Sequence, residues 1–214
     1  MAQFYSTLDQ NSIIGEIFST AKKEILIISP FIQLHKHFKD ILSGIIEDDK
    51  IKIRIVYGKN ENDKSKSFNP DDIDFFKKFR NIEIRYESRL HAKYYGNEEK
   101  GLSTSMNLME YSSNNNKEIG ILVSNNSLLN LNDKLGQAVV NVDNLFAQLT
   151  KLANEIFDKA VVEYRKMPQY SEGVILGMGK KYISSKVDVD KLNFTKPVKE
   201  SYREEKKYKM SHNK

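Results

Sequence analysis

The chain has 214 residues, of which 39% are hydrophobic, so it is long enough for one main domain with a sizeable core. It contains no cysteine, which excludes disulfide bonds and cysteine-ligated zinc and favours a reducing, cytoplasmic location. The first residues lack the basic and apolar regions of a signal peptide, and no apolar run comes near the about 20 residues that cross a bilayer. We therefore expect neither export nor a transmembrane segment.

The formal net charge of +5 is concentrated near the C-terminus. From Lys186 to Lys214, nine Lys or Arg stand against five Asp or Glu, so the rest of the chain is almost neutral. A basic tail suits contacts with nucleic-acid phosphates, but a merely solvated tail is the commoner explanation. Charge alone favours nucleic-acid binding only modestly.

The first quarter of the chain predicts helices and strands in alternation. Residues 11–21 open with two candidate capping residues and then repeat apolar side chains at three- and four-residue spacing, which predicts an amphipathic helix. The continuous apolar run 24–29 predicts a central strand that is covered on both faces. A second helix is predicted over 38–45, and an alternating, half-buried strand over 51–57.

The middle of the chain continues this alternation. Residues 58–68 are polar, carry three lysines and predict a long loop, a kind of segment that is often functional. An Asn-Pro pair then predicts the start of a third helix over 70–79. Strands are predicted over 82–86 and 118–123, and strands interleaved with helices indicate an α/β sandwich around one sheet.

The last third of the chain begins with a long predicted helix. Apolar residues hold a helical spacing over 142–164, a stripe wide enough to cover a sheet or a partner subunit. The glycine-rich stretch 173–181 lacks the spacing and the Ser or Thr of a phosphate-binding loop, so we expect no nucleotide there. The rest is expected to be irregular. These features predict a domain over 1–166 and a basic C-terminal extension over 167–214.

Five polar residues gather at the ends of predicted strands. They are His91, Lys93, Ser105, Asn107 and Glu118. Side chains two positions apart on a strand share a face, so each of the two pairs can point into one pocket. Together they offer a nucleophile or acid/base, a cation and hydrogen-bond donors, all suited to phosphate oxygens. On spacing alone a purely structural role is the commoner reading, because Ser and Asn are turn residues and a lone His is usually structural.

The same residues resemble a known family. His91-Ala92-Lys93, then Glu98, Thr104-Ser105-Met106-Asn107 and Glu118 resemble the H-x-K-x4-D…G-S-x-N motif of the phospholipase D superfamily. The likeness is nearest to single-motif bacterial nucleases and metal-independent restriction endonucleases. The order of the predicted helices and strands resembles that of the family over about residues 10–165. Ser29-Pro30-Phe31 also resembles a strand end that is common in the family. Glu98 stands where the family has aspartate, and Thr104 stands where it has glycine.

This resemblance implies a phospholipase D-like α-β-α sandwich around a mixed central sheet, and a phosphodiesterase that needs neither metal nor cofactor. A His91 nucleophile would form a covalent phosphohistidine while a second His protonates the leaving oxygen. Lys93 and Asn107 would stabilise charge on the phosphate oxygens, and Glu98 would only support the structure. No metal cluster is evident, because His35 and His37 are two positions apart and do not share a helix face.

The motif occurs once in the chain, whereas the implied mechanism needs two copies. A homodimer with both motifs at its two-fold axis supplies the second copy, and the helix 142–164 is a candidate interface. The leading function is a DNA endonuclease in restriction or phage defence, with a separate recognition partner choosing the target. The alternatives are a phospholipase or phosphatidyltransferase, and a catalytically inactive nucleic-acid-binding module.

Overall fold

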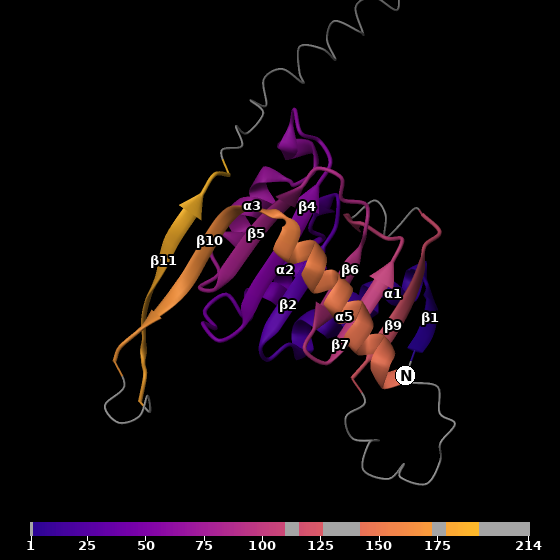
Figure 1. The fold of residues 1–214 in the computed structure, drawn as a ribbon, viewed down its shortest axis with the longest axis horizontal. Helices are drawn as coiled ribbons and strands as arrows, with labels where there is room; N and C mark the ends of the chain where they lie inside the picture. Colours follow the sequence, from indigo (N-terminus) through magenta and orange to yellow (C-terminus); the bar gives the residue numbers. More distant parts are fainter. Residues whose placement is uncertain (1, 110–115, 126–141, 173–178, 193–214) are drawn as a thin grey trace, which may run out of the picture.

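A mixed sheet of nine strands forms the centre of the protein (Figure 1). The computed structural model describes residues 2–109, 116–125, 142–172 and 179–192. Across the sheet the strands are Ala2–Ser6 (β1), Ile119–Ser124 (β9), Lys100–Thr104 (β7), Tyr94–Asn97 (β6), Glu24–Ile28 (β2), Lys52–Gly58 (β4), Ile82–Glu87 (β5), Val161–Tyr170 (β10) and Tyr182–Asp190 (β11).

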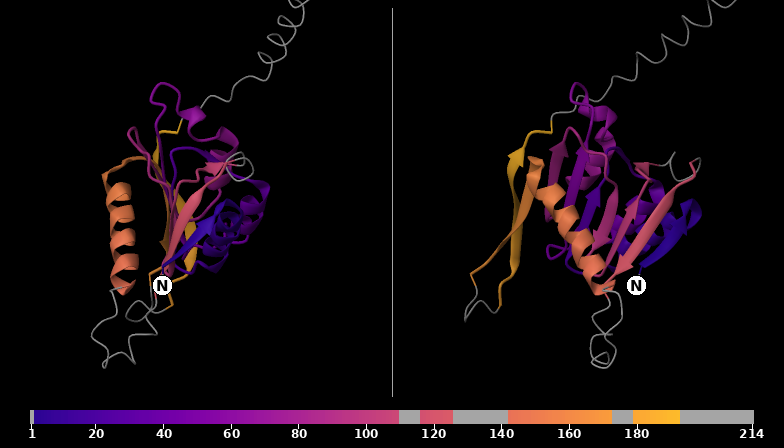
Figure 2. Two further views of the ribbon diagram at one scale, coloured as in Figure 1. Left: turned by 90° about the vertical axis from the view of Figure 1, so that its right-hand side faces the viewer. Right: turned by 45° about the vertical axis from the view of Figure 1, so that its right-hand side comes forward.

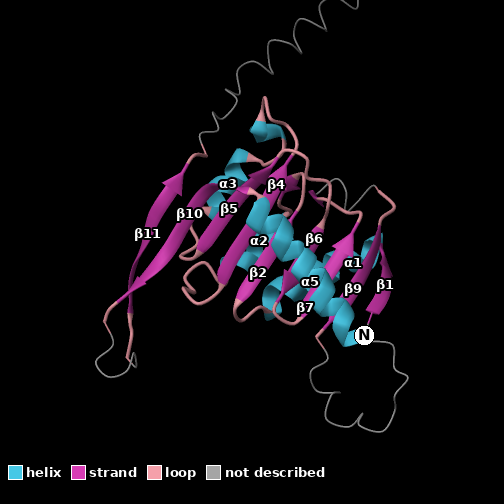
Figure 3. Ribbon diagram, viewed as in Figure 1, coloured by secondary structure: helices cyan, strands magenta, loops and turns pink. Residues whose placement is uncertain are grey.

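Helices cover both faces of this sheet. They are Thr7–Thr20 (α1), Lys36–Ser43 (α2), Pro70–Phe76 (α3) and Val142–Lys159 (α5), with a 3-10 turn at Lys64–Lys66 (η1). The first three helices lie on one face and α5 crosses the other (Figures 2 and 3). The predicted α-β-α sandwich around a mixed sheet is therefore confirmed. Within the described ranges, none of the helices is long and apolar enough to span a bilayer.

The central position of β2 follows from its apolar sequence. Ile25 and Ile27 pack into the core under α1, α2 and α3, whereas Leu26 and Ile28 pack into the separate core under α5. Because successive side chains on a strand point to opposite faces, a continuous apolar run is buried only when both faces are covered. This confirms the prediction of a central strand.

One edge of the sheet collects the ends of several strands. β2, β4 and β5 are parallel, so their carboxyl ends lie at the same edge. β6 begins there, because it is antiparallel to β2 with Tyr94 opposite Ile28, and β7 ends there with Ser103 opposite Tyr94. β9 also begins there, with Gly120 opposite Thr104. We term this the carboxyl edge.

Ser29 joins two segments at the carboxyl edge. Its hydroxyl donates to the carbonyl oxygen of Phe31 at 2.7 Å and accepts from the amide of Leu108 at 3.1 Å. Beside it, Ile32–Gln33 (β3) and Leu108–Met109 (β8) form a small parallel sheet. The end of β2 is thus tied to the segment that follows β7.

The N-terminal elements and α3 differ from the prediction. α1 begins at Thr7, several residues earlier than the capping pattern indicated, and β1 precedes it. β1 was not predicted, since it is largely exposed and is held by antiparallel pairing with the distant β9, as in Phe4 opposite Ile121. α3 ends at Phe76 rather than Phe79, where the chain turns toward β5.

The C-terminal elements correct two further predictions. The long helix ends at Lys159 rather than at residue 164, because β-branched Val161 and Val162 begin β10, which pairs with β5. Residues 182–190 are not irregular but form β11 on β10. β10 crosses the predicted boundary between the domain over 1–166 and the extension over 167–214. The division into these two parts stays a prediction. The glycine-rich residues 173–178 and the tail from 193 lie outside the described residues.

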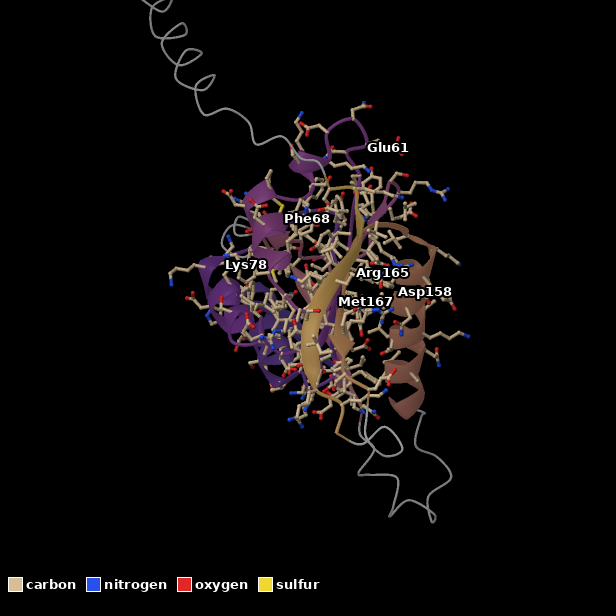
Figure 4. All side chains as sticks on the ribbon, turned by 90° about the vertical axis from the view of Figure 1, so that its left-hand side faces the viewer. Glu61, Phe68, Lys78, Asp158, Arg165 and Met167 are labelled. Atoms are coloured by element: carbon tan, nitrogen blue, oxygen red, sulfur yellow. The ribbon has the colours of Figure 1, made fainter. Side chains whose placement is uncertain are left out.

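α5 is fixed to the sheet through Phe157. The guanidinium carbons of Arg54 and Arg85 lie 4.1 and 4.3 Å from the centroid of its ring. Arg85 also donates to the carbonyl oxygens of Phe157 and Asp158, each at 3.0 Å, near the negative end of the helix dipole. Figure 4, in which the sheet is viewed along its edge, shows Asp158 on the α5 side and Lys78 on the other.

Glu98 fixes the connection between α1 and β2. Its carboxylate accepts from the backbone amides of Lys22 at 2.8 Å, Lys23 at 3.3 Å and Glu24 at 3.4 Å. Partial burial alone raises the pKa of Glu98, but these hydrogen bonds outweigh it and the pKa falls below its ordinary value of 4.5. The charged carboxylate therefore stabilises the fold.

Replacing Phe157 by Ala is expected to lower the free energy of unfolding by about 3–5 kcal/mol, because it leaves a cavity between two guanidinium groups. Urea unfolding followed by circular dichroism measures the loss. Gln148→Ala, on an exposed part of the same helix, serves as the control with a loss of about 0.5 kcal/mol or less. Equal losses in the two variants would contradict the proposed anchor.

Glu98→Gln is expected to cost about 1–2 kcal/mol at neutral pH, because charge-assisted hydrogen bonds to three amides are weakened. Since the folded pKa of Glu98 is depressed, the wild-type advantage is complete above the unfolded value and is lost as pH falls through the folded one. Urea unfolding at neutral and acid pH tests both points. Glu99→Gln, which removes only an exposed ion pair with Lys22, should have little effect.

Candidate active site

Three segments bring the predicted site residues to the carboxyl edge. His91 and Lys93 lie in the stretch that leads into β6, just before the strand rather than on it. Ser105 and Asn107 follow the end of β7, and Glu118 immediately precedes β9. Because β6, β7 and β9 are hydrogen-bonded neighbours, all five residues come to one end of three adjacent strands.

Two cations disfavour the protonated form of His91. The positive charge of Lys93, followed by that of Lys59, lowers the pKa of the exposed His91 imidazole below its ordinary value of 6.5. Lys93 is partly buried, and its ammonium donates to the carbonyl oxygen of His91 at 2.8 Å. The pKa of Lys93 is lowered by burial and by Lys59, while the nearby carboxylate of Glu118 opposes this shift. Neutral pH therefore favours an unprotonated His91, the form that can act as a nucleophile.

Ser105 and Glu118 form a direct pair. The hydroxyl of Ser105 donates to Glu118 Oε2 and accepts from the amide of Ile119 at 3.1 Å. The other carboxylate oxygen of Glu118 accepts from the side chain of Asn116 at 3.1 Å. These bonds close the gap between the end of β7 and the start of β9, and they hold an acid close to Lys93.

Asn107 carries a buried acceptor without a partner. Its Oδ1 atom makes no hydrogen bond to any residue that the structure describes. A buried polar atom left in this way costs free energy, so such atoms are rare and require an explanation. Within the described residues, no hydrogen bond joins the side chain of Asn107 to His91, Lys93 or Ser105.

The two positions that depart from the family pattern both make structural contacts. Thr104 bonds through its hydroxyl to the side chain of Gln10 on α1 and accepts from the amide of Met106 at 2.9 Å. Glu98 lies beyond the far end of β6 from Lys93 and bonds to the turn before β2. Neither the Thr104 hydroxyl nor the Glu98 carboxylate contacts His91.

An open pocket of about 370 Å³ lies beside these residues. Its polar side is formed by His91, Lys93 and residues 103–105, and its apolar side by Leu149, Leu152, Ala153 and Ile156 of α5. A second opening of about 460 Å³ shares His91, Ala92 and Ile156 with the first and continues toward Glu87, Arg89 and Lys159. His91 thus borders a trough that extends along α5 in both directions.

Sequence reasoning did not single out two parts of this site. Lys59 was recognised only as one of three lysines in a polar loop, although its position directly after a glycine at the end of β4 was a usable signal. The apolar wall from α5 could not be placed without knowledge of the packing. No cluster of three or more His, Asp or Glu suited to a metal ion occurs among the residues that the structure describes.

Comparisons with known proteins identify a family and a shared fold. The sequence matches the family model described as cardiolipin synthase, PLD-like domain, over residues 14–143. No curated protein matches the sequence.

Several solved structures share the fold at low sequence identity. The phospholipase D family member Nuc from Salmonella typhimurium is 12% identical, with a TM-score of 0.52 over 76% of this chain and 97% of that one. NucT from Helicobacter pylori is 12% identical, with a TM-score of 0.55 over 76% and 98%. Phosphatidylserine synthase from Haemophilus influenzae is 17% identical, with a TM-score of 0.54 over 75% of this chain and 39% of that one.

The matched range 14–143 is more than half of the chain and contains all five predicted site residues. The fold agrees with structures of that family. This protein is a member of the phospholipase D-like domain family.

Proposed function

We propose that this protein is a metal-independent phosphodiesterase, and specifically a nuclease that hydrolyses DNA through a covalent phosphohistidine on His91. The observation that carries the proposal is the setting of His91, whose exposed side chain lines an open pocket next to Lys93. An imidazole that only serves structure has no need of a cation beside it and a free approach for substrate.

The proposed reaction has two displacement steps. An imidazole nitrogen of His91 attacks phosphorus, the bond from phosphorus to the leaving oxygen breaks, and a second His donates a proton to that oxygen. Water then attacks the phosphohistidine, the P–N bond breaks, and the second His takes a proton from the water. Lys93 stabilises charge on the phosphate oxygens, and the side-chain amide nitrogen of Asn107 is proposed to donate a hydrogen bond to one of them. Ser105 and Glu118 hold this end of the strands in place.

The second His is proposed to come from a second copy of the chain. An exposed apolar surface beside the pocket supports this assignment. It comprises Phe4, Ile119, Ile121, Leu145 and Leu152, with exposed fractions of 73%, 63%, 36%, 42% and 58%. Strand register places Phe4 opposite Ile121 and Ile121 opposite Ser103, so this surface continues from the pocket wall across β9 to β1. Two such surfaces meeting about a two-fold axis would be buried together.

A phospholipid is the second candidate substrate. One wall of the pocket is apolar and consists of Leu149, Leu152, Ala153 and Ile156, a lining that suits an acyl chain beside a phosphodiester. The nuclease proposal is preferred because the trough also continues past His91 toward Arg89 and Lys159, and cations along the path suit a polyanionic chain.

The nuclease proposal is tested by incubating the protein with plasmid DNA in excess EDTA. We expect cleavage by the wild type and a loss of about a thousandfold or more in His91→Ala, because the attacking nitrogen is removed. His37→Ala, which removes an exposed imidazole on α2, should keep full activity. Cleavage that survives His91→Ala would exclude His91 as nucleophile. Phospholipid turnover without DNA cleavage would replace the substrate, and DNA binding without either would identify an inactive binding module.

The shared site is tested by coexpressing differently tagged wild-type and His91→Ala chains in equal amounts. If each dimer holds one site with two imidazoles, only wild-type homodimers are active and the activity per wild-type chain falls to about half. Coexpression with His37→Ala, whose chains stay active, should leave the activity per total chain at the wild-type level. An activity per wild-type chain that is indifferent to His91→Ala would indicate that each chain works alone.

A further inference from the structure

The loop after β4 carries three lysines with different surroundings. Lys64 pairs with the buried Glu163, and its ammonium lies 4.1 Å from the centroid of the Tyr86 ring. Lys66 pairs with Asp63 at 3.5 Å. Lys59, in contrast, has no acidic partner within the part of the chain that the structure describes. Two lysines of the loop are therefore neutralised by the fold, and one is left at the carboxyl edge.

The backbone at Gly58, just before Lys59, packs closely against the segment that leads to His91. A Cβ atom added to Gly58 would lie 2.1 Å from the carbonyl oxygen of Glu87 and 2.7 Å from Cβ of Leu90. Leu90 immediately precedes His91, so only glycine allows the end of β4 to approach the histidine segment this closely. Lys59 is the next residue and enters the same neighbourhood.

The conformation of Lys59 is also unusual. Its φ angle is +80°, and no other non-glycine residue in the described ranges has a positive φ. The hydroxyl of Tyr86 donates to the carbonyl oxygen of Lys59 at 2.8 Å and so helps to hold this conformation. Lysine rarely adopts a left-handed backbone conformation, and residues held in such conformations cluster at functional sites.

The side chain of Lys59 is directed over the carboxyl edge. Its ammonium lies 5.9 Å from the centroid of the Phe31 ring, which follows the end of β2. The charge of Lys59 lowers the pKa of both His91 and Lys93, so Lys59 interacts electrostatically with both groups. Figure 4 shows the loop that follows, with Glu61 labelled, extending beyond the end of the sheet. These three basic groups repel one another, and Glu118 offsets only part of the charge on Lys93, so a bound phosphate would relieve the remaining repulsion.

We propose that Lys59 is a phosphate-binding residue of this site, whose ammonium contacts a non-bridging oxygen of the phosphate held by His91 and Lys93. The inference rests on the proposed phosphodiester chemistry and adds a cation that lies outside the motif. Lys59 would lower the cost of negative charge on phosphate and would position the group for attack by His91.

The test uses inorganic phosphate as the probe and the imidazole NMR signal of His91 as the readout, with the signal assigned by its loss in His91→Ala. Lys59→Gly removes the ammonium while retaining a residue that favours positive φ, so the variant is expected to fold with unchanged or higher thermal stability. Lys59→Arg keeps the charge. Lys66→Ala is the matched control, since it removes another lysine of the same loop.

We expect Lys59→Gly to weaken phosphate binding by about tenfold, the loss of one charge-assisted hydrogen bond, and Lys59→Arg to stay within about threefold of wild type. The pKa of His91 should rise in Lys59→Gly, because a positive neighbour is removed, and should not move in Lys66→Ala. The other charged groups that border His91 are left unchanged in every variant: Lys93, Glu118, Glu87, Arg89 and Lys159.

Unchanged phosphate affinity in Lys59→Gly, or an equal loss in Lys66→Ala, would overturn the proposal. Failure of the wider function has a different signature. If the wild type binds phosphate in a Lys59-dependent manner but cleaves neither DNA nor phospholipid, the phosphate site stands and the phosphodiesterase proposal falls.

Discussion

Antiparallel pairing of β6 with β2 is the constraint on which the candidate site depends. A sheet of parallel strands alone would carry the chain from each carboxyl end back to the opposite edge. Because β6 instead starts where β2 ends, with Tyr94 opposite Ile28, the residues before β6 share an edge with the ends of β2, β4 and β5. The hairpin to β7 then returns the chain to the same edge at Ser105. Two short strands thus bring together residues from both halves of the motif.

The charged residues at the carboxyl edge favour the neutral form of the His91 imidazole. Lys93 and Lys59 both disfavour the protonated form of His91, and Glu118 partly compensates the charge on Lys93. The Ser105–Glu118 bond keeps that carboxylate at the strand ends, where it acts on the ammonium and also closes β7 onto β9. The site therefore holds two lysine charges near His91 while the neutral form of its imidazole is favoured.

Much of the fold and the residues of the candidate site could be read from the sequence, because they are set by local pattern. The run Ile25–Ile28 has no polar side and demands two covered faces, and the spacing from His91 to Glu118 identifies the family. Other features depend on contacts between distant segments. The pairing of β1 with β9 leaves no periodic signal, and the end of α5 at Lys159 is decided by the pairing of β10 with β5. The separate position of Lys59 emerges only when Lys64 and Lys66 are seen in ion pairs.

The departures from the family motif are accommodated by ordinary contacts. Glu98 reaches three backbone amides with its longer side chain, so an acid one methylene longer than aspartate still fixes the start of β2. Thr104 bonds to Gln10 and thereby ties the end of β7 to α1.

The apolar wall of the pocket has a consequence for the order in which the site is completed. Residues 149–156 of α5 follow the whole motif in the chain, so during synthesis every polar group of the site is made before the wall that faces it. Leu26 and Ile28 on the central strand stay uncovered until α5 docks. A nascent chain that stops short of this helix carries the complete motif on an unprotected sheet, and the pocket exists only once α5 has packed.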